Sequence, residues 1–212
     1  MQDVAWAHSR ALGFDLAWYR ERGRFWLVQC VDLQVIERTE PGAVLSVSTE
    51  VLAMRRIRAR RESLFMTAGG TLAAIAQVDW VMTTPEGVPA RILPELLARF
   101  GASERLEPAR VDPGRAPAGA RELTWTARSH ETDPMRHANH AAYVDWLDEV
   151  ISAGGGAALV ESVPRRYRVE YLAPVRQGER VVVRAWPEGH GWAAAFVAGD
   201  GPAVFRARVD PG

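Results

Sequence analysis

Asp133, His137 and Asn139 lie together in the segment ETDPMRHANHAAYVDWLDEV (131–150), which leads into a predicted amphipathic helix. A carboxylate such as Asp133 can activate a water molecule or attack a carbonyl carbon directly. His137 can donate a hydrogen bond to the carbonyl oxygen, and Asn139 stands where a helix N-cap belongs. The first turn of a helix adds unpaired N–H groups and a positive dipole end, which stabilise an oxyanion. The pattern therefore permits hydrolysis at a carbonyl group, with these three residues as the catalytic candidates.

Two other interpretations of the same segment stay open. Asp and Asn before a helix are ordinary capping residues, and Asp133-Pro134 is an ordinary turn sequence. The histidines His130, His137 and His140 suggest a metal site, but no carboxylate or cysteine stands at a characteristic ligand spacing. We therefore expect no metal ion.

The composition is that of a soluble globular protein. The 212 residues carry 26 basic and 26 acidic side chains, so the overall charge gives no indication of nucleic-acid or membrane binding. No apolar run approaches the length of about 20 residues that a membrane span needs. The N-terminus lacks a signal-peptide pattern, and the single Cys30 excludes an internal disulfide, so we expect a packed thiol and a cytoplasmic location.

The order of predicted elements indicates a duplicated α+β unit. Each half has a helix followed by about four strand-like runs, which predicts an antiparallel sheet wrapped around one long helix. The stretch 101–120 is rich in Pro, Gly and Ala and is interpreted as a linker between units at 1–100 and 121–212. The triplet Gly154-Gly155-Gly156 after the second helix is interpreted as a flexible exit.

The two halves differ at one end. The second half has a strand and the Asp133 loop ahead of its helix, and the first half has no counterpart. We therefore expect the first unit to lack its opening strand and to carry no copy of Asp133 or His137, through a start codon placed too late or through genuine loss. A missing strand would expose a sheet edge through which two copies could pair as a homodimer.

The segment HANHAAYVDWLDEV resembles the H-V-N-N-x-x-Y-x-x-W stretch of hotdog-fold thioesterases, most closely the acyl-ACP thioesterases of plants and bacteria. The first half is similar to the same family in EPGAVLSVSTEV, in the arginine-rich strand and in VDWVMTTPEGVPARILPEL with its W-V-M signature. The resemblance implies a double hotdog fold, catalytic residues in the C-terminal unit, and no cofactor. It also implies release of free fatty acid from acyl-ACP, which terminates fatty-acid synthesis.

In that resemblance the family's aspartate falls on Asp133, its histidine on His137 and an asparagine on Asn139, with His140 as the neighbour that helps to polarise the thioester carbonyl. Met135 replaces an asparagine of the plant members and is a poor hydrogen-bonding partner for water. The positions of the plant Glu-Cys pair are Pro174 and Val175, which excludes a cysteine nucleophile there. An acyl-CoA thioesterase and a non-catalytic acyl-binding module are the alternatives.

Two further features are candidates for substrate binding. MRRIRARR contains five arginines, which either dock acidic acyl carrier protein or CoA phosphates or form a solvated strand end; they are Arg55, Arg56, Arg58, Arg60 and Arg61. Glu170, in the middle of the predicted strand RVEYLAP, either faces the site or is paired within the sheet.

Overall fold

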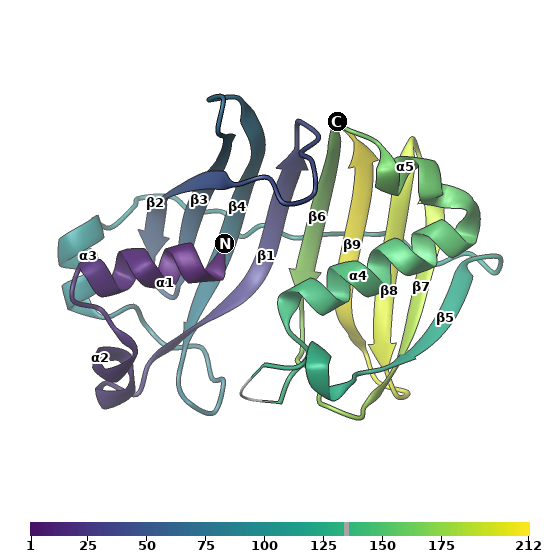
Figure 1. Ribbon diagram of the computed structural model, residues 1–212. Helices are drawn as coiled ribbons and strands as arrows, with labels where there is room; N and C mark the ends of the chain where they lie inside the picture. Colours follow the sequence, from purple (N-terminus) through teal and green to yellow (C-terminus); the bar gives the residue numbers. More distant parts are fainter. Residues whose placement is uncertain (134–135) are drawn as a thin grey trace. The chain divides into compact units, whose positions relative to one another are not determined.

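The computed structural model describes residues 1–133 and 136–212, which form two compact units, Met1–Ala109 and Arg110–Gly212. The boundary between the units falls inside the stretch interpreted as a linker. Figure 1 shows that each unit consists of an antiparallel sheet with a helix against it. No helix in the two described ranges is long and apolar enough to cross a membrane.

Unit 1 is a four-stranded sheet with short helices around it. Its elements are α1 (Gln2–Ala11), α2 (Leu16–Glu21), β1 (Phe25–Val35), β2 (Leu45–Arg55), β3 (Arg58–Thr67), β4 (Leu72–Thr83) and α3 (Pro94–Phe100). The strands pair antiparallel in the order β2-β3-β4-β1. Only Ala5 of α1 is buried, and Trp6 remains 40% exposed, so α1 covers its sheet loosely. Cys30 is buried on β1 and its thiol donates to the carbonyl oxygen of Ala109 at 3.0 Å, as expected for a packed thiol.

Unit 2 has five strands and a long, well-packed helix. Its elements are β5 (Arg121–Thr126), η1 (Ser129–Glu131), α4 (His140–Ile151), η2 (Ser152–Gly156), α5 (Ala157–Glu161), β6 (Arg165–Tyr171), β7 (Arg180–Glu188), β8 (Gly191–Ala198) and β9 (Ala203–Pro211). The strands pair antiparallel in the order β6-β9-β8-β7-β5. Strand β5, which precedes α4, has no counterpart before α1 among the described residues of unit 1.

Helix α4 is amphipathic, as the sequence predicted. One face is buried against β7 and β5. Its buried residues recur at helical spacing and are Ala142, Tyr143, Trp146, Leu147, Val150 and Ile151. Burial of this face holds the N-terminal end of α4, and therefore the loop before it, in a fixed place on the sheet of unit 2.

The segment interpreted as a linker is hydrogen-bonded along much of its length. The N–H of Ser103 donates to the carbonyl oxygen of Met54 at 2.7 Å, and the N–H of Ala109 donates to Asp79 Oδ2 at 3.0 Å. On the other side of the boundary, the N–H of Val111 donates to Glu170 Oε2 at 3.1 Å. The stretch is thus fixed to the unit on each side of residue 109.

The glycines after α4 serve close packing, and the interpretation as a flexible exit is wrong. A Cβ atom on Gly154 would lie 2.6 Å from Cη2 of Trp192, and one on Gly156 would lie 2.6 Å from Nε1 of the same indole. Only glycine leaves room for the Trp192 ring against this wide turn. Gly155 has φ 100°, a left-handed conformation that glycine adopts without strain.

Asp148 of α4 is an ionisable group that costs stability at neutral pH. Burial raises its pKa from 3.8 to about 6, although the hydroxyl of Tyr167 donates to both carboxylate oxygens at 3.1 and 3.2 Å. A carboxyl group whose pKa is higher in the folded than in the unfolded state destabilises the fold when ionised. The penalty is absent below pH 3.8, grows as the pH rises, and is complete above about pH 6.

The Asp148→Asn variant is therefore expected to be more stable than the parent at pH 7.5. The stability difference between variant and parent should be about 1–3 kcal/mol larger at pH 7.5 than at pH 4. Urea unfolding at the two pH values measures this difference. Ala141→Ser, on the exposed part of the same helix, adds no ionisable group and serves as the control; its effect on stability should be the same at both pH values. An equal stability difference at both pH values would contradict the assignment.

Candidate active site

The described residues of the segment between η1 and α4 are hydrogen-bonded to one another. Thr132 pairs with Ala138 across it, and His137 pairs with Arg176. The N–H of Asp133 donates to the carbonyl oxygen of His137 at 2.8 Å. In return, the N–H of His137 donates to Asp133 Oδ1 at 3.0 Å. The Asp133 carboxylate is thus fixed beside His137 by the main chain; Pro134 and Met135 lie outside the described residues.

His140, the first residue of α4, lies close enough to Asp133 for the charge of that carboxylate to act on its imidazole. Burial lowers the pKa of His140, while the charge of Asp133 opposes the shift without cancelling it. The ring is therefore neutral at pH 7, and one of its nitrogens can donate while the other accepts. It packs edge-on against Tyr171 with ring centroids 4.7 Å apart, and the Tyr171 hydroxyl donates to the carbonyl oxygen of His140 at 3.0 Å.

A second set of contacts ties the loop to the segment between β6 and β7. The N–H of Ala138 donates to the carbonyl oxygen of Val175 at 2.8 Å. The N–H of Val175 donates to the hydroxyl of Tyr143 at 3.0 Å, and burial raises the pKa of Tyr143 to about 12. The tyrosine therefore stays neutral and holds the loop and α4 together. Val175 is completely buried, so this residue is a packing position in unit 2.

Asn139 is the N-cap of α4. Its Oδ1 accepts from the N–H groups of Ala141 at 2.9 Å and Ala142 at 3.1 Å. These N–H groups of the first turn are therefore not free to bind an oxyanion, contrary to the expectation from the sequence. What the helix end offers to a developing negative charge is its dipole, together with the side chains around it.

Glu131 is a residue that sequence reasoning missed. Its Oε1 accepts from Trp146 Nε1 at 3.0 Å, and its Oε2 accepts from the N–H of Arg128 at 2.7 Å. Burial would raise the pKa of Glu131, but these hydrogen bonds outweigh it and lower the pKa. Its carbonyl oxygen also accepts from the N–H of Asn139 at 2.9 Å. Only half of a capping box is present here, because the glutamate accepts from the N-cap N–H while the arginine at the N-cap has no acceptor to offer in return.

Glu170 is not brought to this loop. It is 2% exposed, and its Oε2 accepts from the N–H of Val111. Its neighbour on β6, Tyr171, contacts α4, and successive side chains of a strand point to opposite faces. Glu170 therefore lies on the face of the sheet that α4 does not cover. Among the described residues, no group of three His, Cys, Asp or Glu side chains is placed to hold a metal ion.

The five arginines of β2 and β3 do not form one surface. Arg60 forms a bidentate ion pair with Asp79 at 2.6 and 2.8 Å, and Arg61 is only 8% exposed. Arg55, Arg56 and Arg58 line a hollow at the turn between the two strands. Arg58 also donates to Gln29 Oε1. Arg55, Arg56 and Arg58 thus remain together in unit 1 with Glu107 beside them, and of the three only Arg56 is exposed.

Comparison with known proteins confirms the expected resemblance at the level of the fold. Residues 135–198 match the family model of the thioesterase superfamily. The chain superposes on an acyl-ACP thioesterase from Bacteroides thetaiotaomicron with TM-score 0.80 and 18% identity, covering 97% of this chain and 84% of that one. It superposes on a 12:0-ACP thioesterase from Umbellularia californica with TM-score 0.77 and 18% identity, over 99% and 86% of the two chains.

A third solved structure, described as an oleoyl thioesterase from Lactobacillus plantarum, gives TM-score 0.81 and 22% identity, over 97% of this chain and 82% of that one. No curated protein sequence matches the chain. The class defined by these findings is the α+β double hotdog fold, as the sequence predicted. The segment of unit 2 that matches the thioesterase superfamily includes His137, Asn139 and His140 but begins after Asp133.

Proposed function

We propose that the protein hydrolyses fatty acyl thioesters and that its substrate is carried by acyl carrier protein. The observation that supports this most strongly is the position of Asp133, whose carboxylate is held by the His137 N–H and lies close enough to His140 to influence its pKa. A carboxylate that acts as general base and an imidazole at the start of a buried helix can together support hydrolysis of a thioester.

In the proposed reaction, Asp133 accepts a proton from water as the water oxygen attacks the thioester carbonyl carbon. The carbonyl electron pair moves to oxygen, and a hydrogen bond from His137, together with the α4 dipole and His140, stabilises the oxyanion. Collapse of this intermediate breaks the carbon–sulfur bond, and the departing thiolate takes the proton from Asp133. The products are one free carboxylic acid and one free thiol. In the alternative route, Asp133 attacks directly and water then hydrolyses the resulting anhydride.

Acyl carrier protein is proposed as the carrier because of the surface arginines of unit 1. Acyl carrier protein is strongly acidic, and Arg55, Arg56 and Arg58 gather at one turn. Guanidinium groups bind carboxylates and phosphates well, and the contact between exposed charges weakens as salt screens it. The names of two structural relatives also specify an ACP substrate, for those proteins.

The experiment is a comparison of dodecanoyl-ACP and dodecanoyl-CoA in the same thiol-release assay. We expect kcat/KM to be at least tenfold higher with the ACP substrate, and KM for that substrate to rise at least threefold between 20 and 200 mM salt. The double variant Arg55→Gln/Arg56→Gln should raise the same KM about three- to tenfold with kcat little changed.

Arg20→Gln, an exposed arginine on α2, is the matched control and should leave both constants unchanged. A preference for the CoA substrate would support an acyl-CoA thioesterase instead. A KM for acyl-ACP that is insensitive to salt and to the arginine changes would contradict the docking surface. Retention of intact thioester by the parent protein would indicate a non-catalytic acyl-binding module.

A further inference from the structure

The outer edge of β2 is the open end of the unit 1 sheet. The strand orders β2-β3-β4-β1 and β7-β8-β9-β6 are equivalent, and in unit 2 the strand β5 pairs with the outer side of β7. Among the described residues, no strand pairs with the outer side of β2 (Figure 1). Val181 and Val183 of β7 are completely buried. Val47 and Val51, at inner positions of β2, remain partly exposed, so the β2 edge lacks the cover that its counterpart has.

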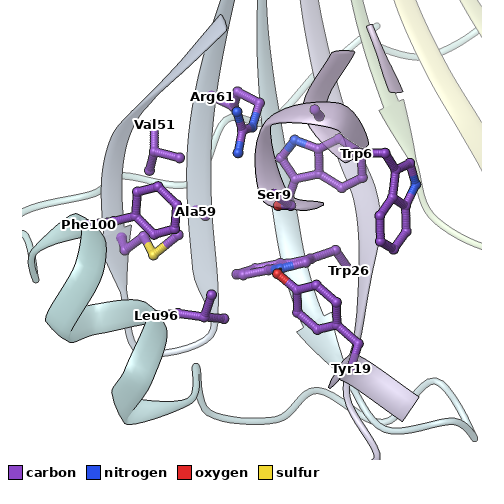
Figure 2. A pocket seen from close by; sticks show the side chains of 12 residues that line it. Trp6, Ser9, Tyr19, Trp26, Val51, Ala59, Arg61, Leu96 and Phe100 are labelled. Carbon is purple, nitrogen blue, oxygen red and sulfur yellow. The ribbon is translucent and has the colours of Figure 1, made fainter. Parts of the chain in front are cut away.

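The two faces of β2 differ in chemistry. Val51 lies opposite Arg61 of β3, and Figure 2 shows both side chains at the same pocket in the interior of unit 1. The residues that alternate with Val51 share this inner face, and they are Leu45, Val47 and Thr49. The residues between them are exposed on the outer face, and they are Ser46, Ser48 and Glu50. The inner face of the strand is therefore mainly apolar, and the outer face is polar.

The chain itself closes only one end of this edge. The N–H of Ser103 donates to the carbonyl oxygen of Met54 at 2.7 Å, and the N–H of Met54 donates to the hydroxyl of Ser103 at 3.2 Å. A β-bulge between Val51 and Ala53 separates this end from the regular part of the strand, 45–51. The regular part contains no lysine and no proline, the residues with which proteins commonly protect a free edge.

We propose that the regular part of β2 pairs antiparallel with the same residues of a second copy of this chain, about a two-fold axis at Ser48. Residues directly opposite each other in paired strands lie on the same face, so inner residues must meet inner residues. Around Ser48, Leu45 of one copy lies opposite Val51 of the other. Val47 lies opposite Thr49 in the same way. Each open edge thus receives an antiparallel strand, as β7 does from β5.

The outer face is also matched in this register. Ser46 lies opposite Glu50, and Ser48 lies opposite itself, so no like charges meet. Beyond the ends of the regular part, Val44 of one copy comes opposite Leu52 of the other. Val44 is 81% exposed and Leu52 is 43% exposed in the single chain, and pairing would cover both. A register centred on Glu50 would instead place two carboxylates opposite each other, which is destabilising.

The contact is small, because each copy contributes one strand. Interfaces at the small end of the range are weak or transient, so we expect a dissociation constant of about 1–100 µM. The pairing concerns unit 1 alone and does not depend on hydrolysis at Asp133. Sedimentation of the parent protein over a range of concentrations that spans this constant should show a reversible equilibrium between monomer and dimer. A parent that stays monomeric throughout would overturn the proposal and would mean that a strand other than β2 covers this edge.

Two lysine variants test the register. Ser48→Lys places two ammonium groups opposite each other at the axis and should raise the dissociation constant at least threefold. Ser46→Lys, two residues away on the same exposed face, places each lysine opposite Glu50 of the other copy and should lower the constant at least twofold. A dimer that both lysines weaken equally, or that neither affects, would contradict pairing through β2 about Ser48.

Oxidation of cysteine variants tests the same geometry independently of affinity. Residues directly opposite have Cα atoms about 4.5–5.5 Å apart, which a disulfide can span, so Ser48→Cys should form a covalent dimer. In Ser46→Cys the two new thiols lie four residues apart along the strands, about 14 Å, and should not join. A mixture of Ser46→Cys and Glu50→Cys should cross-link, whereas neither should alone. Cys30 is buried and common to all the variants. Cross-linking of Ser48→Cys no faster than that of Ser46→Cys would overturn the proposal.

Discussion

The Asp133→Asn variant is expected to hydrolyse acyl thioesters at least 100-fold more slowly than the parent, with KM little changed. Asparagine retains an oxygen that can accept the His137 N–H, as Asp133 Oδ1 does at 3.0 Å. The loop therefore keeps its shape, but the side chain can no longer take a proton from water or attack as a nucleophile. Loss of a general base typically lowers the rate by about 10²–10⁴-fold. The measurement is kcat for thiol release at pH 7.5.

The control for this substitution is Asp145→Asn on the exposed part of α4, which should turn over substrate at the parent rate. Unfolding curves of the two variants should match that of the parent, so that a lost activity is not a lost fold. Turnover by Asp133→Asn within threefold of the parent would show that the carboxylate does not perform the chemistry.

The Leu147→Ala variant is expected to lose about 3 kcal/mol of stability, the largest effect on folding that we predict. Leu147 is completely buried on the face of α4 that packs against the sheet of unit 2. Truncation of a buried leucine to alanine removes hydrophobic contacts and leaves a cavity, at a cost of about 2–5 kcal/mol. Urea unfolding of the transition that includes unit 2 measures the loss.

Glu149→Ala, an exposed position on the same helix, is the matched control and should change stability by less than about 0.5 kcal/mol. A cost for Leu147→Ala that is no larger than that of the control would mean that α4 is not anchored through this face. The position of His140 and of the Asp133 loop depends on that anchoring, because both lie at the N-terminal end of the helix.

The parts that the sequence predicted well are those with a local physical signature. The helical spacing of apolar residues gave α4 and its buried face, and Asn139 gave the position of its N-cap. The duplicated order of elements predicted the two α+β units, and the difference between the halves predicted that β5 has no counterpart among the described residues of unit 1. Each of these features depends on residues that are close together in the chain.

The parts that were not predicted depend on contacts between distant segments. The arginine run could not show that Arg60 meets Asp79 or that Arg61 points inward, because strand alternation has no fixed phase until the sheet is formed. In the same way, Gly154 and Gly156 acquire their role only when Trp192 packs on them. The sequence around Glu131 showed the local spacing but not the indole of Trp146 that it accepts from.

The central claim is that Asp133 cleaves a fatty acyl thioester. The most direct test measures the free thiol and free fatty acid that the parent and Asp133→Asn release from dodecanoyl-ACP under the same conditions. The account predicts that the parent releases free thiol and free fatty acid in equal amounts over many turnovers, and that the variant leaves the thioester intact. Equal product release by both proteins, or a parent that retains the uncleaved substrate, would contradict it.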